Sequence, residues 1–234
     1  MGAPEVGDVA PDALLMDPDG HDVRISSMWS AQPAVVVFLR YFGCPFCQAQ
    51  VVAIRRDQEM FREAGAHVVL IGHGNHEDAL AFLQAKRVPF PLLLDRDREA
   101  YRAYGLTQGK VMQVLSPKTA LPWLRAELSP ETRQHGLKGG SFMQMPGTFV
   151  IDTGGVVRFR GGLIQFAHRN KHVADSPAND DILRVVASLA TRPPDTEEPG
   201  RPEPSGPSGR RDGGDQPFST GAPTSEPYSV HEPS

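Results

Sequence analysis

Three short segments of the chain consist almost entirely of apolar residues, many of them β-branched. A continuous run of this kind is typical of a strand that is buried on both faces of a sheet. The run from Val35 to Leu39 predicts a central strand, and similar runs predict two more strands at His67 to Gly72 and Pro91 to Leu94.

Elsewhere apolar residues recur at intervals of three and four, which is the spacing of one face of a helix. This pattern predicts a helix from about 45 to 63, with Cys47 and Phe61 on its buried side and Gln48 on its solvated side. Capping residues help to place three further helices. These are predicted at 76–86 after Asn75, at 95–104 before Gly105, and at 178–189 after Ser176-Pro177.

Turn residues mark two hairpins. Asp17-Pro18-Asp19-Gly20 lies in the middle of the segment Met16 to Ile25 and predicts an N-terminal β-hairpin. Near the other end, Thr148 to Ile151 and Val156 to Phe159 are predicted to pair across Asp152-Thr153-Gly154-Gly155. Strands that alternate with helices and end in a hairpin and a helix indicate an α/β fold, with a mixed central sheet flanked by helices.

The composition places a boundary near residue 190. Residues 1–190 carry 20 basic and 20 acidic side chains, whereas residues 191–234 carry 4 and 8 and account for the net charge of −4. The second segment is rich in Pro, Gly, Ser and Glu, so it cannot bury enough apolar surface to offset the entropy of ordering. We therefore predict a folded domain at 1–190 and a disordered tail at 191–234, with a less regular stretch at 107–140.

Composition also narrows the classes of partner. No basic field suggests nucleic acid, and no apolar stretch approaches the roughly 18 residues of a membrane span. The start of the chain lacks the basic and apolar blocks of a secretory signal. We therefore expect a soluble cytoplasmic protein that binds neither nucleic acid nor membrane.

The candidate chemistry lies in Cys44-Pro45-Phe46-Cys47, which contains both cysteines of the chain. The motif follows the predicted central strand and opens the predicted helix. Cys44 would occupy the N-cap and Pro45 the first helical position, where backbone N–H groups and the helix dipole favour a thiolate. Cys47 lies one turn later on the same face. The spacing therefore indicates Cys44 as the nucleophile and Cys47 as the resolving thiol.

Other interpretations of the two cysteines remain open at this point. They could form half of a zinc site if the fold brought His73 and His76 beside them, although the chain has no second cysteine pair. They could also be inert core residues, or belong to a redox fold that only binds a partner. His73 and His76 are also candidate proton donors to a leaving thiolate.

Several segments resemble the AhpC/TSA-like, peroxiredoxin-like group of the thioredoxin superfamily. The redox segment Phe38 to Cys47 is the most specific of them. The resemblance extends over roughly residues 6 to 190. It is also carried by Ala10-Pro11-Asp12 with the hairpin that follows, Asp95-Arg96-Asp97, Tyr104-Gly105-Leu106, and His168-Arg169-Asn170-Lys171-His172 with Asp175.

The resemblance implies a thioredoxin-like fold and a thiol-based antioxidant oxidoreductase. Such an enzyme reduces peroxides or disulfides through its dithiol, and a reductant such as thioredoxin or glutathione regenerates it. No metal or organic cofactor is implied, and a homodimer is left open. Because Cys-Pro-Phe-Cys is similar to the Cys-Pro-Tyr-Cys of glutaredoxins, disulfide exchange without peroxidase activity is the alternative, beside a non-catalytic binding module.

The superfamily also implies a cis-proline before its penultimate strand, facing the dithiol. Met145-Pro146 fits that place, and the backbone there is expected to bind a disulfide substrate. The sequence departs from typical peroxiredoxins in one respect. Their Pro-x-x-x-Thr-x-x-Cys is absent, because the corresponding pair is Val37 and Tyr41 counted from Cys44, or Arg40 and Cys44 counted from Cys47.

Overall fold

A mixed β-sheet forms the centre of the molecule. The computed structural model describes residues 2–109, 141–153 and 162–190, and within this part the sheet has seven strands in the order β2-β1-β5-β4-β3-β6-β7. The strands are β1 (Leu14–Met16), β2 (Asp22–Arg24), β3 (Ala34–Phe38), β4 (His67–Gly72), β5 (Leu92–Leu94), β6 (Gly147–Ile151) and β7 (Ile164–Arg169).

The three strands predicted from continuous apolar runs lie together in this sheet. β4 is parallel to both β3 and β5, with Phe38 opposite Ile71 in the first pair. β6 runs antiparallel to β3, and β7 runs antiparallel to β6. Every residue of β3 is buried, as its uninterrupted apolar sequence requires. The predicted mixed sheet is therefore confirmed.

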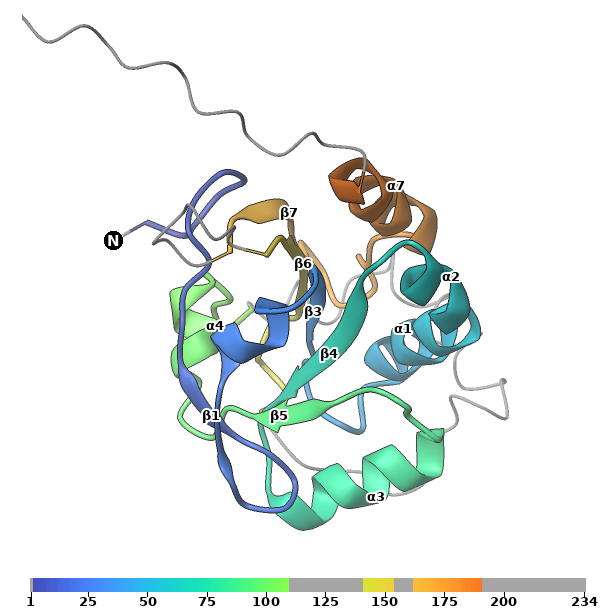
Figure 1. Cartoon of the computed structure of the whole chain (residues 1–234). Coiled ribbons are helices and arrows are strands. Elements are labelled where there is room, and N and C mark those ends of the chain that lie inside the picture. Colours follow the sequence, from blue (N-terminus) through green and yellow to red (C-terminus); the bar gives the residue numbers. More distant parts are fainter. Residues whose placement is uncertain (1, 110–140, 154–161, 191–234) are drawn as a thin grey trace, which may run out of the picture. The chain divides into compact units, whose positions relative to one another are not determined.

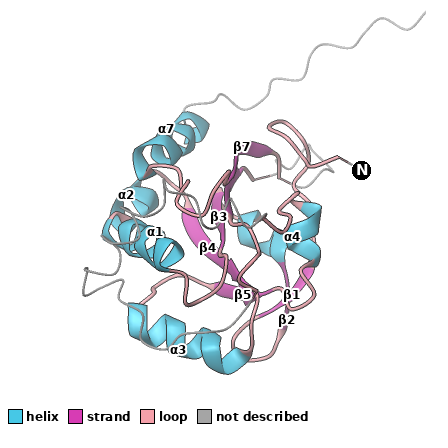
Figure 2. Cartoon of the chain, turned by 180° about the vertical axis from the view of Figure 1, so that it is seen from behind, coloured by secondary structure: helices cyan, strands magenta, loops and turns pink. Residues whose placement is uncertain are grey.

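Helices cover both faces of the sheet (Figures 1 and 2). Val35 and Val37 face one core and Val36 and Phe38 face the other, because alternate side chains of a strand point to opposite faces. The first core is shared with α1 (Pro45–Arg56), α2 (Gln58–Glu63), α3 (His76–Lys86) and α7 (Asn179–Ala190), and the second with the 3₁₀ helix η1 (Ile25–Trp29) and α4 (Glu99–Ala103).

Two predicted helices differ from those observed. The helix expected from 45 to 63 breaks at Asp57, which leaves helical geometry at φ −96° and ψ 12°. Its carboxylate accepts a hydrogen bond from Asn179 of α7 at 2.6 Å, a tertiary contact that no local pattern reveals. The helix expected from 95 starts at Glu99, because the Asp95 carboxylate instead accepts the N–H groups of Glu99 and Tyr101.

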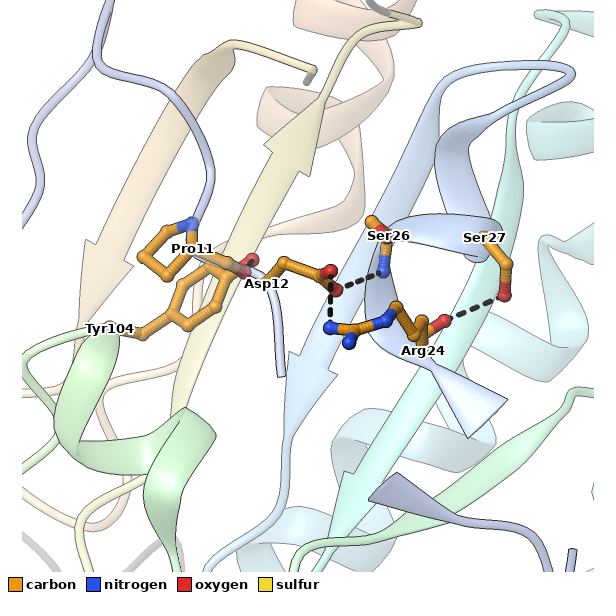
Figure 3. Close-up of polar contacts among 6 residues, drawn as sticks. All are labelled: Pro11, Asp12, Arg24, Ser26, Ser27 and Tyr104. Atoms are coloured by element: carbon orange, nitrogen blue, oxygen red, sulfur yellow. Dashed lines mark hydrogen bonds and ion pairs between the residues drawn. The ribbon is translucent and has the colours of Figure 1, made fainter. Parts of the chain in front are cut away.

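The N-terminal hairpin forms as predicted and adds β1 and β2 to the sheet. Gly20 takes a φ of +93° in its turn, a conformation that suits glycine. Asp12 fixes the base of the hairpin, since its carboxylate accepts hydrogen bonds from the guanidinium of Arg24 and the N–H of Ser26, each at 3.1 Å (Figure 3). Beside it, the Tyr104 hydroxyl donates to the carbonyl of Pro11 at 3.0 Å.

The hairpin predicted across Asp152 to Gly155 is tested only in part. β6 is present, but the partner strand predicted at Val156 to Phe159 lies outside the described residues. The partner that the structure shows is β7, which was not predicted. The predicted tail at 191–234 and residues 110–140 also lie outside the described part of the chain.

Candidate active site

The two cysteines lie where β3 passes into α1. Cys44 is the N-cap residue of α1 in an extended conformation, and Pro45 is at the first helical position. Both thiols are free, and both are buried in the core shared with α1. The predicted strand-to-helix position of the motif is therefore observed, and the thiols lie beneath the surface.

Two aromatic rings fix the backbone that leads into the motif. The Tyr101 hydroxyl lies 2.6 Å from the carbonyl oxygen of Leu39 and 3.0 Å from that of Ile71, and so ties together the ends of β3 and β4. His73 donates from Nε2 to the carbonyl of Arg40 at 2.6 Å. The ring of His73 packs edge-on against Tyr101. Together these contacts set the direction in which the chain leaves β3.

Gln48 fixes the next part of the turn. It was predicted on the solvated side of the helix, but it is completely buried, and its Nε2 donates to the carbonyl of Phe42 at 2.8 Å. Gln48 packs against the turn that precedes α1, and helical spacing alone does not predict this contact. The N–H of Cys44 donates to Tyr41 O at 3.1 Å. The backbone before Cys44 is therefore held at successive residues.

The surroundings of the two thiols shift their pKa values in opposite directions. Burial opposes ionisation of Cys44, but hydrogen bonds from the thiol and backbone of Cys47, together with the charge of Arg40, lower its pKa from 9.0 to about 7. The hydrogen bond to Cys44, burial and the negative charge on Cys44 raise the pKa of Cys47 well above its ordinary value. The backbone N–H of Arg40 contacts Cys47 Sγ at 3.3 Å. Cys44 is thus the better nucleophile near neutral pH.

Arg40 is buried beside the dithiol, with only 2% of its surface exposed. Its guanidinium lies 4.2 Å from the ring centroid of Phe142 and 5.3 Å from that of Tyr41. Nε and Nη2 of Arg40 make no hydrogen bond in the structure. Its position directly after a strand would also fit a solvated side chain, so its burial is a feature that only the tertiary structure shows.

His73 does not have the free nitrogen that a proton donor to a leaving thiolate needs. Nδ1 accepts the N–H of Ser141 at 3.2 Å, while Nε2 donates to Arg40 O. Burial lowers its pKa from 6.5 to about 4, and repulsion from Arg98 acts in the same direction. His73 is therefore a neutral ring that joins the turn after β3 to the segment before β6. His76 is the first residue of α3.

The zinc interpretation is not supported by the described residues. Within that part of the chain, the single group of metal-ligand side chains that lie close together is Asp17, Asp19 and His21, in the exposed hairpin turn. Asp17 already accepts the N–H groups of Asp19 and His21. Among the described residues, no histidine or carboxylate is grouped with the two cysteines as a ligand.

Met145 and Pro146 lead into β6, which pairs with β3. The predicted cis bond between them is wrong, because the described backbone has no cis peptide bond. A trans proline is compatible with this position, because a proline that precedes a strand removes no donor from the hydrogen bonds of the sheet. The Pro146 carbonyl accepts the N–H of Asn170 at 3.2 Å. The substrate-binding role of Met145 and Pro146 stays a prediction.

The polar residues near 170 mainly join segments of the chain. His168 Nε2 donates to the carbonyl of Asp175 at 2.7 Å, and the Asp175 carboxylate accepts the N–H of Lys171. Arg169 donates from Nε to Tyr104 O at 2.8 Å. His172 Nδ1 is buried without a hydrogen-bond partner.

These features define a thioredoxin-fold protein with a buried dithiol at a helix N-terminus. The AhpC/TSA family profile matches residues 6–160, and the chain belongs to this family. Its curated relatives include the thioredoxin-like protein AAED1 of Arabidopsis thaliana, 25% identical over 183 residues that cover 74% of this chain and 70% of the relative. Peroxiredoxin-like 2C of Mus musculus is 23% identical over 175 residues, which cover 74% of this chain and 76% of the relative.

A solved structure shows the same fold. Peroxidoxin BcpB from Mycobacterium tuberculosis superposes with a TM-score of 0.57 and 20% identity, over 81% of this chain and 99% of that protein. The expected thioredoxin-like fold is therefore confirmed. In the described part of this chain, no helix combines the length and apolar character of a membrane span.

Proposed function

We propose that this protein is a thiol oxidoreductase that reduces peroxides or disulfides by cycling between a Cys44–Cys47 dithiol and a disulfide. The observation that carries the proposal is the opposite shift in pKa of two adjacent buried thiols at the start of α1. Such a pair supplies one thiolate to attack and keeps one protonated thiol to resolve the product. Membership of the AhpC/TSA family supports the same class of chemistry.

The reaction has two bond exchanges. The Cys44 thiolate attacks an O–O or S–S bond and becomes a sulfenic acid or a mixed disulfide, while the leaving alkoxide, hydroxide or thiolate takes up a proton. Cys47 then loses its proton and attacks the Cys44 sulfur, which releases water or a second thiol. The substrate is reduced by two electrons and the dithiol is oxidised by two. A thioredoxin-like or glutathione-like thiol restores it.

Disulfide exchange is the second candidate, and one observation favours it. Counted from the proposed nucleophile Cys44, the threonine and proline of the peroxiredoxin motif are replaced by Tyr41 and Val37. Strong acceleration of peroxide cleavage needs donors arranged around the breaking bond, and this chain lacks the motif that supplies them in typical peroxiredoxins. The comparison of peroxide with disulfide as substrate therefore decides between the two activities.

The setting of the enzyme follows from the same chemistry. A dithiol cycle needs a compartment that keeps thiols reduced, and we propose the cytoplasm. The segment 191–234 is proposed as a disordered tail that takes no part in the cycle, and the backbone of Met145 and Pro146 as the strand-like edge that receives a disulfide substrate.

Mass spectrometry of the intact protein tests the proposal. Reduced protein is mixed with hydrogen peroxide or with a small disulfide, and the loss of two hydrogens that marks the Cys44–Cys47 bond is followed with time. We expect Cys44→Ser to abolish the loss, and Cys47→Ser to trap a sulfenic acid or mixed disulfide on Cys44. Oxidation by both oxidants at the rate of a free thiol would refute the enzyme and leave a binding role.

A further inference from the structure

The buried guanidinium of Arg40 has donors that the protein does not satisfy. Nε and Nη2 are buried and make no hydrogen bond in the structure. The ion pairs found among the described residues do not include Arg40. An unsatisfied buried donor is destabilising, and more so when it is charged. Among the described residues, these two donors are therefore left without an acceptor.

The aromatic contacts of Arg40 do not supply that acceptor. Phe142 lies over the guanidinium at 4.2 Å from its ring centroid, and such a contact engages the flat face of the group. The N–H groups point outward in the plane of the guanidinium, where Nε and one terminal nitrogen form a fork that matches a carboxylate. Phe142, which covers one face of the guanidinium, is itself 51% exposed.

The proposed reaction also removes the negative charge that compensates Arg40. In the reduced protein the Cys44 thiolate faces Arg40 and compensates its charge. When Cys44 becomes a mixed disulfide or a sulfenic acid, that negative charge is lost, and a buried cation without a partner is costly. An anion brought by the substrate would replace the thiolate as the partner of Arg40 at this step.

We propose that Arg40 binds a carboxylate of the oxidising substrate, so that the enzyme selects disulfides or hydroperoxides that carry a carboxylate close to the S–S or O–O bond. This inference rests on the proposed function. Nε and Nη2 form two parallel hydrogen bonds to the carboxylate oxygens, while Cys44 attacks the neighbouring sulfur or oxygen. The bond exchange itself is unchanged: each turnover forms one protein disulfide and reduces one substrate S–S or O–O bond.

Paired probes test this selectivity. Dithiodipropionate and its neutral diamide have the same S–S bond and differ only in charge, and cystamine supplies the cationic case. A hydroperoxide with a carboxylate and tert-butyl hydroperoxide form the corresponding peroxide arms. The rate of Cys44–Cys47 disulfide formation is measured for each probe with the full chain. We expect the carboxylate probe to react at least about tenfold faster than its neutral partner, a difference of about 1.4 kcal/mol.

Variants of Arg40 separate recognition from activation of the thiol. Arg40→Gln is expected to remove the preference for the carboxylate probe, while Arg40→Lys keeps the charge but loses the fork and is expected to retain only part of it. Arg62→Gln, which changes an exposed arginine of α2, is expected to retain the full preference. Circular dichroism and a melting curve of each variant establish that it is folded.

The outcomes distinguish the two proposals. If wild-type protein reacts with no probe faster than a free thiol does, the proposed function fails. If wild-type protein reacts rapidly but charged and neutral probes react alike, or if Arg40→Gln slows both probes by the same factor, then Arg40 acts only on the Cys44 thiolate. Either of these last two results overturns the carboxylate proposal and leaves the oxidoreductase intact.

Discussion

Two chemically identical side chains acquire different roles from their positions along a single helical turn. Cys44 lies before the first turn of α1, where hydrogen bonds from Cys47 and the charge of Arg40 favour its thiolate. Cys47 lies inside the turn and donates to that thiolate, so its own ionisation is opposed. Because each thiol shifts the other, losing one cysteine must change the acidity of the one that remains.

A titration of the thiolate tests this coupling. The ultraviolet absorbance of thiolate in the reduced protein is expected to rise with a midpoint near the pKa of about 7 for Cys44, below the ordinary 9.0. Cys47→Ala removes the hydrogen bond from the neighbouring thiol, so the midpoint is expected to move up. Cys44→Ser removes this step altogether. A single transition at the ordinary thiol value in the wild type would contradict the assigned roles.

The turn from β3 into α1 depends on side chains from α4, from the end of β4 and from α1 itself. Tyr101 of α4 reaches the carbonyl of Leu39, His73 after β4 reaches that of Arg40, and Gln48 of α1 reaches that of Phe42. All three side chains are buried. The carbonyl direction and the position of Arg40 beside Cys44 are therefore consequences of packing between elements.

Removing one hydroxyl shows how far the dithiol depends on this support. Tyr101→Phe removes the hydroxyl donor of the buried Leu39 carbonyl, whereas the Ile71 carbonyl keeps the N–H of Leu39. We therefore expect a loss of about 1–3 kcal/mol in the free energy of unfolding. We also expect the pKa of Cys44 to rise towards that of a free thiol, because Arg40 is held less firmly. Urea denaturation and the thiolate titration measure the two effects.

Tyr104→Phe is the matched control. It removes the same group from a buried tyrosine of the same core, but its hydroxyl donates to Pro11 beside the N-terminal hairpin. A comparable loss of stability is expected, with the pKa of Cys44 unchanged. If both variants shifted the thiolate titration equally, the local role of Tyr101 would be refuted.

At the scale of the whole molecule, His73 links segments that are far apart in the sequence. It bridges the turn after β3 and Ser141 before β6 from its place at the end of β4. Nε2 can donate in either protonation state, but Nδ1 can accept the Ser141 N–H only in the neutral ring. Protonation of Nδ1 would replace an acceptor with a donor opposite the Ser141 N–H. This hydrogen bond therefore depends on pH.

The buried, neutral state of His73 predicts a loss of stability in mild acid. The pKa of His73 is about 4 in the folded protein against 6.5 for an ordinary histidine, chiefly because burial disfavours the charged ring. Between these values the unfolded chain takes up a proton that the folded chain does not. The contribution of the neutral His73 to the free energy of unfolding is therefore fully present above pH 6.5. It falls by about 3 kcal/mol as the pH falls towards 4.

Unfolding in urea across this pH range measures the effect. His73→Gln cannot titrate, so its stability is expected to fall less steeply over the same range. His21→Gln changes a histidine of the exposed hairpin and is expected to follow the wild type. Parallel curves for His73→Gln and the wild type would exclude His73 as the source of the pH dependence.

Local patterns predicted most elements of the fold because each of them carries its own physical signal. The apolar runs gave the three parallel strands, Asn75 caps α3 through its contact with the N–H of Asp78, and Gly20 permits the hairpin turn. The failures share a cause. The break at Asp57 is set by the hydrogen bond that its carboxylate accepts from Asn179, and the late start of α4 by those that the Asp95 carboxylate accepts. Helical spacing does not report such bonds.

The sequence by itself determined the order of most of the elements and the place of Cys44 and Cys47 at a helix start, because strand, helix and cap preferences act over a few residues. Only the tertiary structure decided that Arg40 and Gln48 are buried, that both nitrogens of His73 are engaged, and that Tyr101 reaches Leu39. Burial and hydrogen bonding depend on residues up to 68 positions apart in this site. The distinct acidities of the two thiols come from burial and from contacts among Cys44, Cys47 and Arg40, which this packing brings together.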